Sequence, residues 1–278
     1  MQVIKSRRQM TAACRAANRP LGLVPTMGAL HEGHLALVKR ARKDNPTLAA
    51  TIFVNPSQFG PQDDLSAYPR DLDRDLELLR EEGVDLVFTP SVEAIYPPGF
   101  NTWVDVAKLG DRLEGAHRPG HFRGVATVVA KLFNIIGPDN AYFGQKDGQQ
   151  SIVIRKMVRD LDLGVEVVMV PTVRDRDGLA LSSRNTYLTE EQRRAAPVVY
   201  RALQLADRLW QEGNTDGNRL RSETRLVLAS EALIERIDYV SVADAETLEE
   251  LDTVRTLAMV SVAVQLGKPR LIDNIILE

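Results

Sequence analysis

The segment LGLVPTMGALHEGH, residues 21–34, decides the fold because it joins an apolar run to an amphipathic one. Residues 21–25 have the composition of a buried strand, and the apolar periodicity of residues 34–43 predicts a helix. Between these two elements, Gly28 and Gly33 permit a tight turn and a close approach of the backbone to a ligand. A strand that passes through such a turn into a helix is the first half of a βαβ unit, so the segment predicts an α/β fold.

The same alternation continues through the first two thirds of the chain. Further buried-strand patterns occur at residues 48–54, 85–89, 141–143 and 165–170, and helical patterns at residues 72–82, 127–136 and 151–160. Strands connected in this way form a parallel sheet whose carboxyl ends meet at one edge, where open α/β sheets bind ligands. Because the polar motifs of the chain follow these strand ends, we expect a binding site at that edge.

The character of the sequence changes near Thr186. Two helical segments rich in Ala, Leu, Arg and Glu, 189–210 and 219–236, precede strand patterns at 239–244, 256–266 and 270–277. We therefore predict an α/β protein of two domains, a Rossmann-like parallel-sheet N-terminal domain at residues 1–185 and a smaller α+β C-terminal domain at residues 186–278.

The composition is that of a globular protein and argues against several classes. Hydrophobic residues make up 44% of the 278 residues and charged residues 26%, which suffices for a buried core. The formal net charge of −3 argues against a protein whose main role is to bind nucleic acid. The apolar runs are too short to span a bilayer and no apolar segment follows the basic N-terminus, so we expect a cytoplasmic protein without a membrane partner. The single cysteine, Cys14, excludes an intrachain disulfide and is expected to be a buried filler.

His31 and His34 are the most informative residues of the opening segment. They are three residues apart at the predicted helix start, so they share a face, and the N–H groups and dipole of a helix N-terminus favour phosphate. Both rings could donate hydrogen bonds to a phosphate as its charge develops. The alternatives are a helix cap or a metal site, but no third ligand completes a metal set, so we expect no metal centre built by the protein.

A second motif, DGLALSSRN at residues 177–185, follows the last predicted strand of the first domain. Its hydroxyls and arginine are suitable donors for polyphosphate oxygens, although such a run alone is more typical of a polar turn. Combined with the His–Glu–Gly–His segment, the motif resembles the superfamily of nucleotidylyl transferases and class I aminoacyl-tRNA synthetases.

Five segments, in order and with comparable gaps, resemble the pantothenate synthetase (pantoate–β-alanine ligase) family. They are residues 24–35 (VPTMGALHEGHL), 53–60 (FVNPSQFG), 118–130 (RPGHFRGVATVVA), 143–151 (FGQKDGQQS) and 171–187 (PTVRDRDGLALSSRNTY). Residues 64–70 fit as well. The resemblance covers the whole chain, densely to Tyr187 and more loosely beyond it.

The resemblance implies an ATP-dependent ligation of (R)-pantoate and β-alanine to pantothenate, a coenzyme A precursor. Pantoate would form a pantoyl adenylate with release of pyrophosphate, and β-alanine would then displace AMP. The resemblance also implies Mg²⁺ held mainly through the ATP phosphates, a homodimer formed by the N-terminal domain, and a C-terminal domain that acts as a lid.

Carried over residue by residue, the resemblance assigns His34, His31 and Lys146 to catalysis. The ATP site would include these three together with Met27, Gly28, Ala29, Leu30, Glu32, Gly33, Gly144, Gln145, Asp147, Val173, Leu181, Ser182, Ser183 and Arg184. Gln58 and Gln150 would hold pantoate, although Gln150 could also serve only as a helix cap. The candidates near the substrate are Asn55, Tyr68, Arg118 and His121, the last two equally compatible with a surface role. Asp75 is considered as a helper of Mg²⁺, whereas Asp63 and Asp64 are expected to be solvated.

The chain departs from the family pattern Gly–Glu–Lys–Asp–aromatic–Gln–Gln at two positions. Gln145 stands for the acid, and Gly148 stands for the aromatic residue. A glycine adds backbone freedom and removes a large side chain, so we expect a looser pocket wall and weaker substrate binding without loss of the chemistry.

Three alternatives stay open at this point. A different nucleotidylyl transferase would leave the nucleotide on its product, and Gln58 and Gln150 argue against it. An aminoacyl-tRNA synthetase would need a basic anticodon-reading domain, which this short acidic sequence does not show. A weakened nucleotide-binding module would fit the two departures, although both histidines, Lys146 and residues 182–184 are retained.

Overall fold

The computed structural model describes residues 1–60 and 65–278, and the chain divides into two compact units. The N-terminal unit consists of Met1–Gly144 and Gln149–Pro171, and the C-terminal unit of Gln145–Gly148 and Thr172–Glu278. Asp63 and Asp64 lie outside the described residues. Among the described residues, no helix combines the length and the hydrophobicity needed to cross a bilayer.

The N-terminal unit is built on a six-stranded parallel sheet with the order β1-β4-β3-β2-β5-β6. The strands are β1 (Gln2–Ile4), β2 (Leu21–Thr26), β3 (Thr47–Ile52), β4 (Leu86–Phe88), β5 (Asn140–Gly144) and β6 (Glu166–Val170). After β2 the chain adds β3 and β4 on one side, and it later adds β5 and β6 on the other. The boundary between β2 and β5 is therefore the topological switch point, where sheets of this class bind ligands.

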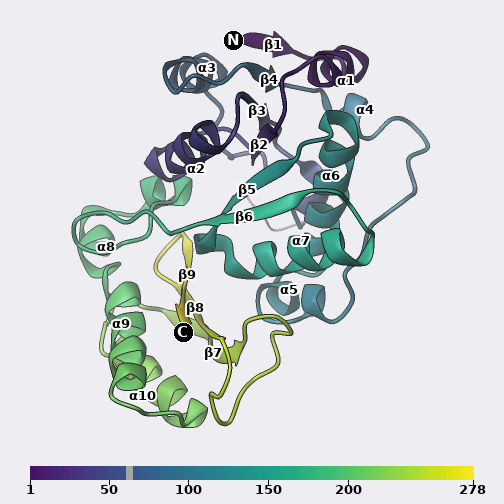
Figure 1. Ribbon diagram of the computed structural model, residues 1–278. Coiled ribbons are helices and arrows are strands. Elements are labelled where there is room, and N and C mark those ends of the chain that lie inside the picture. The colour runs from purple at the N-terminus through teal and green to yellow at the C-terminus, as the bar shows by residue number, and fades with distance from the viewer. Residues whose placement is uncertain (61–64) are drawn as a thin grey trace. The chain divides into compact units, whose positions relative to one another are not determined.

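Helices cover both faces of this sheet (Figure 1). They are α1 (Arg7–Arg15), α2 (Glu32–Asp44), α3 (Leu72–Glu81), α4 (Val92–Ile95), α5 (Glu114–His117), α6 (His121–Ile136) and α7 (Gly148–Asp160), with the 3-10 turns η1 (Pro56–Gln58) and η2 (Leu109–Asp111). Leu37 and Val38 of α2 and Leu79 of α3 form one apolar cluster with the sheet. On α1, burial raises the pKa of Cys14 to about 11, so the thiol stays protonated and acts as a filler.

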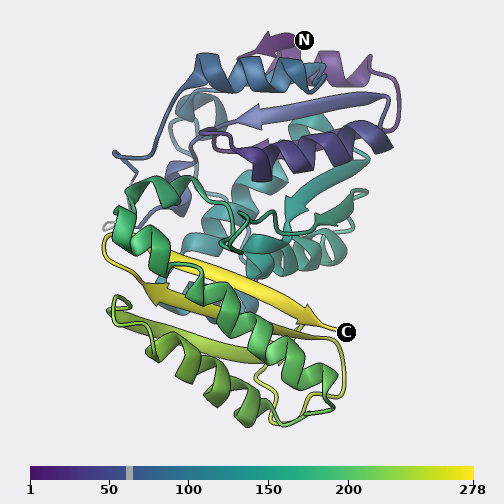
Figure 2. The same cartoon turned by 90° about the vertical axis from the view of Figure 1, so that its left-hand side faces the viewer.

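The C-terminal unit contains a three-stranded antiparallel sheet in the order β7-β8-β9. Its elements are β7 (Arg236–Asp244), β8 (Ala258–Gln265) and β9 (Arg270–Leu277), the helices α8 (Glu190–Ala195), α9 (Val198–Gln211) and α10 (Gly217–Ala229), and the 3-10 turns η3 (Gln145–Asp147) and η4 (Ser183–Tyr187). Figure 2 shows α9 and α10 along one face of the sheet, where alternate valines such as Val240, Val242 and Val260 form the core with the helices.

The division into units differs from the predicted boundary near residue 185. Residues 172–185 and the turn at Gln145–Gly148 belong to the C-terminal unit. Ion pairs explain the first assignment: Arg193 contacts Asp175 at 2.8 Å and Asp177 at 2.5 Å, and Arg174 contacts Asp273 at 2.5 Å.

Three predicted helices have other limits in the structure. The helix predicted at 189–210 is split into α8 and α9, because Pro197 at their junction has no N–H group to continue the ladder. The helix predicted at 219–236 ends at Ala229, since Arg236 already pairs with Gln265 in the sheet, and this pairing overrides the local helical pattern. The helix predicted at 127–136 begins at His121. The sequence did not predict β1.

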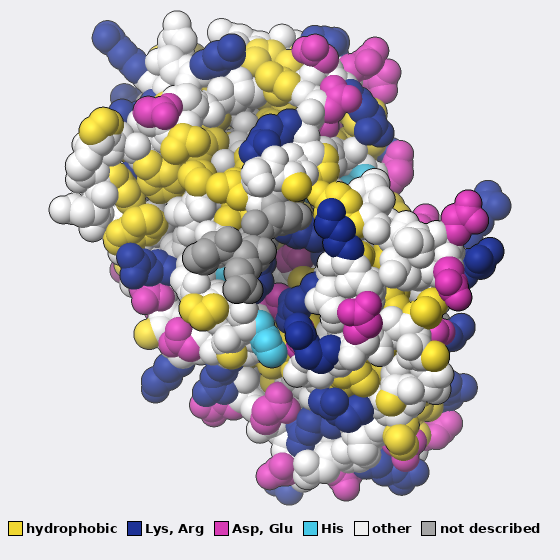
Figure 3. Space-filling model, turned by 180° about the vertical axis from the view of Figure 1, so that it is seen from behind, with side chains coloured by type: hydrophobic (Ala, Val, Ile, Leu, Met, Phe, Trp, Pro, Cys, Tyr) yellow, Lys and Arg dark blue, Asp and Glu magenta, His cyan; other side chains and the backbone are white. Residues whose placement is uncertain are grey.

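Charged side chains of both signs are interspersed on the molecular face drawn in Figure 3. This distribution agrees with the small net charge of −3.

Candidate active site

The turn between β2 and α2 is held by Asp75, a residue of α3. The Asp75 side chain accepts the N–H of Ala29 at Oδ2 (2.9 Å) and the N–H of Leu30 at Oδ1 (2.8 Å). Gly28 has a φ of +85° and Ala29 a φ of +52°, so the turn uses the left-handed region twice. A Cβ at Gly28 would lie 2.9 Å from Asp75 Oδ2, which explains the glycine.

Asp75 is only 2% exposed, and burial raises the pKa of this carboxyl while its two N–H contacts lower it. Both carboxylate oxygens are engaged by backbone N–H groups inside the fold. Asp75 therefore anchors the turn that precedes the two histidines, and its role as a helper of Mg²⁺ stays a prediction.

His31 and His34 form a reciprocal cap at the start of α2. His31 is the N-cap residue, its Nδ1 accepts the N–H of Gly33 (3.1 Å), and Nδ1 of His34 accepts the N–H of His31 (3.3 Å). The ring centroids are 4.1 Å apart. Because both Nδ1 atoms act as acceptors, each neutral ring carries its proton on Nε2. The helix-cap alternative and the phosphate role are thus compatible, since they use different nitrogens.

Glu32 differs from the two histidines on either side of it. Its side chain is exposed and lies 3.9 Å from Lys39 on the same helix. Any contribution of Glu32 to an ATP site would come from its main chain in the first turn of α2.

Gln58 is oriented by Asn55, which is 1% exposed. Asn55 Nδ2 donates to Gln58 Oε1 (2.9 Å) and to the Gly124 carbonyl (3.2 Å), and Asn55 Oδ1 accepts from the hydroxyls of Ser57 (2.9 Å) and Tyr96 (2.8 Å). All hydrogen-bonding groups of the Asn55 side chain are therefore in use. With its Oε1 facing Asn55, Gln58 presents its Nε2 toward Met27, whose Sδ is 3.4 Å away. The structure brings together these two predicted site residues.

Arg118 and His121 also contact Gln58. His121 Nδ1 lies 2.8 Å from the Gln58 carbonyl, and Arg118 lies 3.2 Å from His121 Nε2. With Nδ1 as donor to the carbonyl, Nε2 accepts from Arg118. Both residues therefore contact the main chain of Gln58, and a contact of either one with the substrate stays a prediction. Tyr68 is buried as well, and its ring packs edge-on against Phe59 with centroids 6.0 Å apart.

The two adjacent glutamines of α7 have different environments. Gln149 is 6% exposed, accepts the N–H of Glu114 (3.0 Å), and donates to the carbonyls of Leu109 (2.8 Å) and Arg112 (2.7 Å). Gln150 is half-buried. Gln149 therefore holds the segment before α6, whereas Gln150 stays the candidate for a substrate contact.

The turn that carries Lys146 belongs to the C-terminal unit. Lys146 Nζ lies 3.3 Å from Asp147, and Asn274 of β9 donates to the carbonyls of Gln145 (2.8 Å) and Lys146 (2.9 Å). Gly148 is tightly packed here, because a Cβ on it would lie 2.7 Å from Met259 Sδ and 3.0 Å from Asn274 Nδ2. The expectation of a looser wall at Gly148 is therefore wrong: the position has no room for an aromatic side chain.

The segment with the Ser–Ser–Arg motif folds back on itself in the same unit. The N–H of Leu181 donates to the Val173 carbonyl (3.0 Å), and the Ser182 hydroxyl accepts the N–H of Arg184 (3.3 Å) as the N-cap of η4. The structure thus joins Val173 to Leu181, and Ser182 to Arg184. The predicted site residues form one group in the N-terminal unit and a second group in the C-terminal unit.

Some contributing residues were missed by the sequence. They are Ser57, Tyr96, Gly124, Gln149, Asp273 and Asn274. The need for glycine is clearest at Gly124. A Cβ there would lie 2.3 Å from the Ser57 carbonyl, so η1 could not pack on α6. Among the described residues, no group of three or more His, Cys, Asp or Glu side chains could hold a metal ion.

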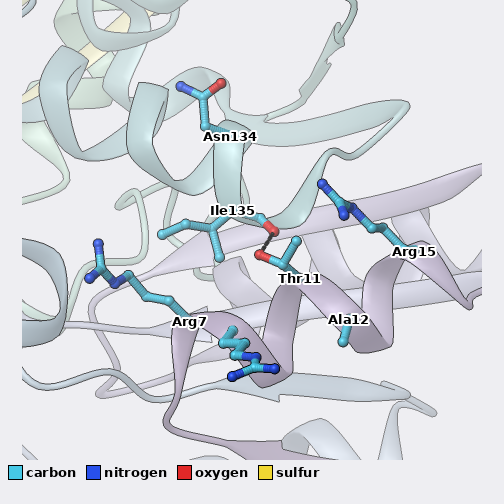
Figure 4. A pocket seen from close by; sticks show the side chains of 7 residues that line it. Arg7, Thr11, Ala12, Arg15, Asn134 and Ile135 are labelled. Carbon is cyan, nitrogen blue, oxygen red and sulfur yellow. Dashed lines mark hydrogen bonds between the residues drawn. The ribbon is translucent and has the colours of Figure 1, made fainter.

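A separate surface groove of about 560 Å³ lies between α1 and α6 (Figure 4). It is lined by Arg7, Arg8, Thr11, Ala12, Arg15, Asn134 and Ile135. Arg7 and Arg15 lie on either side of the hydrogen bond from Thr11 Oγ1 to the Ile135 carbonyl (2.7 Å). All three arginines are exposed and none of the predicted site residues lines the groove, so it does not belong to the candidate active site.

A parallel sheet whose switch-point turn carries two capping histidines defines an α/β protein with a candidate nucleotide site. The family model for pantoate-beta-alanine ligase matches residues 1–276. The chain is 56% identical to the pantothenate synthetase of Roseiflexus castenholzii over 278 residues, 100% of both chains. It is 60% identical to the pantothenate synthetase of Chloroflexus aurantiacus over 265 residues, covering 95% of this chain and 94% of that protein.

Solved structures agree with the sequence comparisons. The crystal structure of pantothenate synthetase from Thermus thermophilus has a TM-score of 0.94 and 50% identity, covering 99% of each chain. That of pantoate-beta-alanine ligase from Francisella tularensis, complexed with beta-gamma ATP and beta-alanine, has a TM-score of 0.80 and 33% identity, covering 99% of this chain and 97% of that one. The chain belongs to the pantoate–β-alanine ligase (pantothenate synthetase) family, which confirms the resemblance and the predicted fold class.

Proposed function

We propose that this chain joins (R)-pantoate to β-alanine at the expense of ATP, with pantoyl adenylate as the intermediate. The family match over residues 1–276 supports the reaction class. The observation that carries the proposal is the reciprocal cap of His31 and His34, which commits both Nδ1 atoms and leaves Nε2 as the proton-bearing nitrogen of each neutral ring.

In the first step, a carboxylate oxygen of pantoate attacks the α-phosphorus of ATP, and the bond from that phosphorus to the pyrophosphate oxygen breaks. His31 and His34 would donate from Nε2 to the phosphate oxygens, and Lys146 would neutralise the charge that develops on them. Three further groups would complete the ATP site. They are the backbone N–H groups of residues 27–34, the turn with Gly144, Gln145 and Asp147, and the segment with Val173, Leu181, Ser182, Ser183 and Arg184.

Gln58 would act in this step as a hydrogen-bond donor. Because Oε1 of Gln58 accepts from Asn55, Nε2 is the group available to an acceptor, such as a carboxylate or hydroxyl oxygen of pantoate. Gln150 would be the second amide contact. In the second step, the amine of β-alanine attacks the acyl carbon, loses a proton, and displaces AMP as the carbon–oxygen bond breaks.

Mg²⁺ would enter with ATP and reduce the negative charge of its phosphates. The family resemblance implies that phosphate oxygens supply most of the Mg²⁺ ligands. The family resemblance further supports a cytoplasmic homodimer formed by the N-terminal domain, residues 1–185. It also supports a C-terminal domain, residues 186–278, that acts as a lid and keeps water from the adenylate. Light scattering would test the dimer.

Pantoate-dependent exchange of labelled pyrophosphate into ATP tests the proposal directly, with Mg²⁺ present and β-alanine absent. We expect exchange that requires pantoate, followed by formation of pantothenate and AMP when β-alanine is added. Folded protein that binds ATP without exchange would instead be the weakened binding module. A product that keeps the nucleotide would indicate a different nucleotidylyl transferase.

A further inference from the structure

Asn274 on β9 lies against the turn that carries Lys146. Its side chain is 4% exposed, and its Nδ2 donates to the carbonyls of Gln145 and Lys146 at 2.8 and 2.9 Å. The buried Asn274 amide therefore fixes two successive peptide groups of η3, although it is 128 residues away from Lys146 in the chain.

The orientation of the Asn274 amide follows from its acceptors. Two carbonyl oxygens on one side require the NH₂ group there, because a carbonyl offers no proton. The Oδ1 atom then faces away, and in the described part of the chain it is buried without a hydrogen-bond partner. An unsatisfied buried oxygen is unfavourable, so the two contacts to the turn must outweigh that cost.

Neighbouring residues keep the Asn274 side chain in place. Asp273 is 3% exposed and accepts from Arg174 at 2.5 and 3.0 Å, and its Oδ1 also accepts the N–H of Asn274 (2.8 Å). On the other side, Gly148 leaves the space that Asn274 fills, since a Cβ there would lie 3.0 Å from Nδ2. Gly148, which departs from the family pattern, therefore makes room for Asn274, which holds the turn.

From these contacts we propose that Asn274 is a positioning residue for Lys146. It acts by fixing the main chain from which the Lys146 ammonium group is presented, and it touches neither the substrate nor the reacting atoms. The inference rests on the proposed function, because it takes Lys146 to stabilise the phosphate charge during adenylation.

The isosteric variant Asn274→Asp tests the proposal, because it replaces the donor group by an oxygen that faces two carbonyls. We expect kcat of pantoate-dependent pyrophosphate exchange to fall about 10- to 100-fold, the order expected when a catalytic group is displaced by ~1 Å. The KM for pantoate should change by less than about twofold, because the lysine acts in the transition state.

The matched control is Ser261→Ala. Ser261 pairs with Asn274 across β8 and β9, is 5% exposed, and has a hydroxyl without a hydrogen-bond partner among the described residues. The substitution removes a buried polar group from the same row of the sheet but leaves the turn alone. We expect its kcat to stay within about twofold of wild type, since no contact to Lys146 is lost.

A pH profile separates positioning from general damage to the fold. A carboxyl group against two carbonyl oxygens has a raised pKa, and only its protonated form can donate to the turn. The ratio of the kcat of Asn274→Asp to that of wild type should therefore increase as the pH falls from about 8 to about 6. A reduced kcat whose ratio does not depend on pH would contradict the proposal.

A double-mutant cycle supplies the decisive readout. If Asn274 acts through Lys146, adding Asn274→Asp to Lys146→Ala should lower the residual kcat by less than about twofold. A further loss as large as in the wild-type background would overturn the proposal, because Asn274 would then act by another route.

Amide hydrogen exchange in residues 143–150 keeps this inference separable from the proposed function. We expect faster exchange in Asn274→Asp and unchanged exchange in Ser261→Ala, whether or not the protein adenylates pantoate. Wild-type protein without pyrophosphate exchange would defeat the proposed function. Unchanged amide exchange in Asn274→Asp would defeat the claim that Asn274 holds the turn.

Discussion

The turns at residues 27–34 and 145–148 are each held by one buried side chain from a distant part of the same unit, but with opposite chemistry. Asp75 accepts the N–H groups of Ala29 and Leu30, whereas Asn274 donates to the carbonyls of Gln145 and Lys146. In the first turn, the N–H groups of Ala29 and Leu30 lie just before the N-cap of α2, and a carboxylate, which only accepts, matches these two donors. In the second turn, two carbonyl oxygens point to one side chain, so an amide NH₂ with two protons matches them.

Asp75 is ionisable and Asn274 is not, so only the first of the two anchors can respond to a proton. Asp75 also holds the main chain that we propose to contact the ATP phosphates. The N–H groups of Ala29 and Leu30 partly offset the negative charge of the Asp75 carboxylate there. The difference between the anchors predicts different outcomes when each turn is disturbed.

The largest effect is expected when the presented groups themselves are removed. His34→Ala and Lys146→Ala should each lower the kcat of pyrophosphate exchange by about 10²–10³, the usual loss for one transition-state donor. The two variants should differ in stability. His34→Ala also removes an acceptor from the cap of α2 and should cost ~1 kcal/mol, whereas Lys146 contacts Asp147 only at 3.3 Å. Urea unfolding distinguishes them, and equal stabilities would contradict the cap.

Asp75→Asn should have the next largest effect. The substitution places an NH₂ group against a backbone N–H, so we expect a loss of about 1–3 kcal/mol in the free energy of unfolding and a fall in exchange activity of about tenfold. Asp71→Asn is the matched control on the same helix. Asp71 is the N-cap of α3, and asparagine caps equally well, so its stability should be unchanged.

The contribution of Asp75 to the free energy of unfolding depends on pH, and the sign of this dependence is defined. Because burial raises the pKa of Asp75 above its ordinary value of 3.8, the folded protein binds a proton more readily than the unfolded chain. The contribution of Asp75 to stability is therefore greatest below pH 3.8 and decreases as the pH rises through the folded-state pKa. The difference in unfolding free energy between wild type and Asp75→Asn should decrease over that interval, and an increase would refute this assignment.

Gly148→Ala tests the packing that surrounds the second anchor. The added Cβ would lie 2.7 Å from Met259 Sδ and 3.0 Å from Asn274 Nδ2, so we expect a destabilisation of about 1–3 kcal/mol, typical of overpacking. Gly144→Ala is the control for stability, because a Cβ there has nothing within 4 Å and Gly144 does not have a positive φ. Thermal unfolding of both variants checks the prediction, and equal melting temperatures would remove the steric argument.

The residues that we propose to act directly stand in local sequence motifs, whereas several of the residues that hold them do not. His31, His34, Gln58 and Lys146 stand in local motifs, and the alternation of strands and helices indicated the parallel sheet. Asp75 lies within a helical segment that has apolar residues on one face. Nothing in the neighbouring sequence indicates that its carboxylate accepts the N–H groups of residues 29 and 30. Such an anchor is defined by contacts between distant segments, so its role depends on tertiary structure.

The departures from the family pattern show the same limit. From the sequence, Gly148 was expected to loosen the site because glycine adds backbone freedom. In the structure Gly148 is tight, because Met259 and Asn274 fill the space of the missing side chain. The effect of a small residue depends on what occupies the vacated volume, and that neighbour is more than 100 positions away in the sequence.

Gln58 is a proposed site residue that is held through its side chain, by Asn55, and disturbing this contact should have the smallest effect. Tyr96→Phe removes one of two hydroxyl donors to Asn55 Oδ1, while Ser57 keeps the other. Loss of one such hydrogen bond, about 1 kcal/mol, should raise the KM for pantoate about threefold to fivefold. It should leave kcat and the KM for ATP unchanged, because the orientation of Gln58 is altered but the phosphate contacts are not. Steady-state exchange kinetics measure all three constants. A fall in kcat at constant KM would mean that the Asn55 network, like the Asn274 contact, acts on the reaction step, and the contrast between side-chain and main-chain anchoring would disappear.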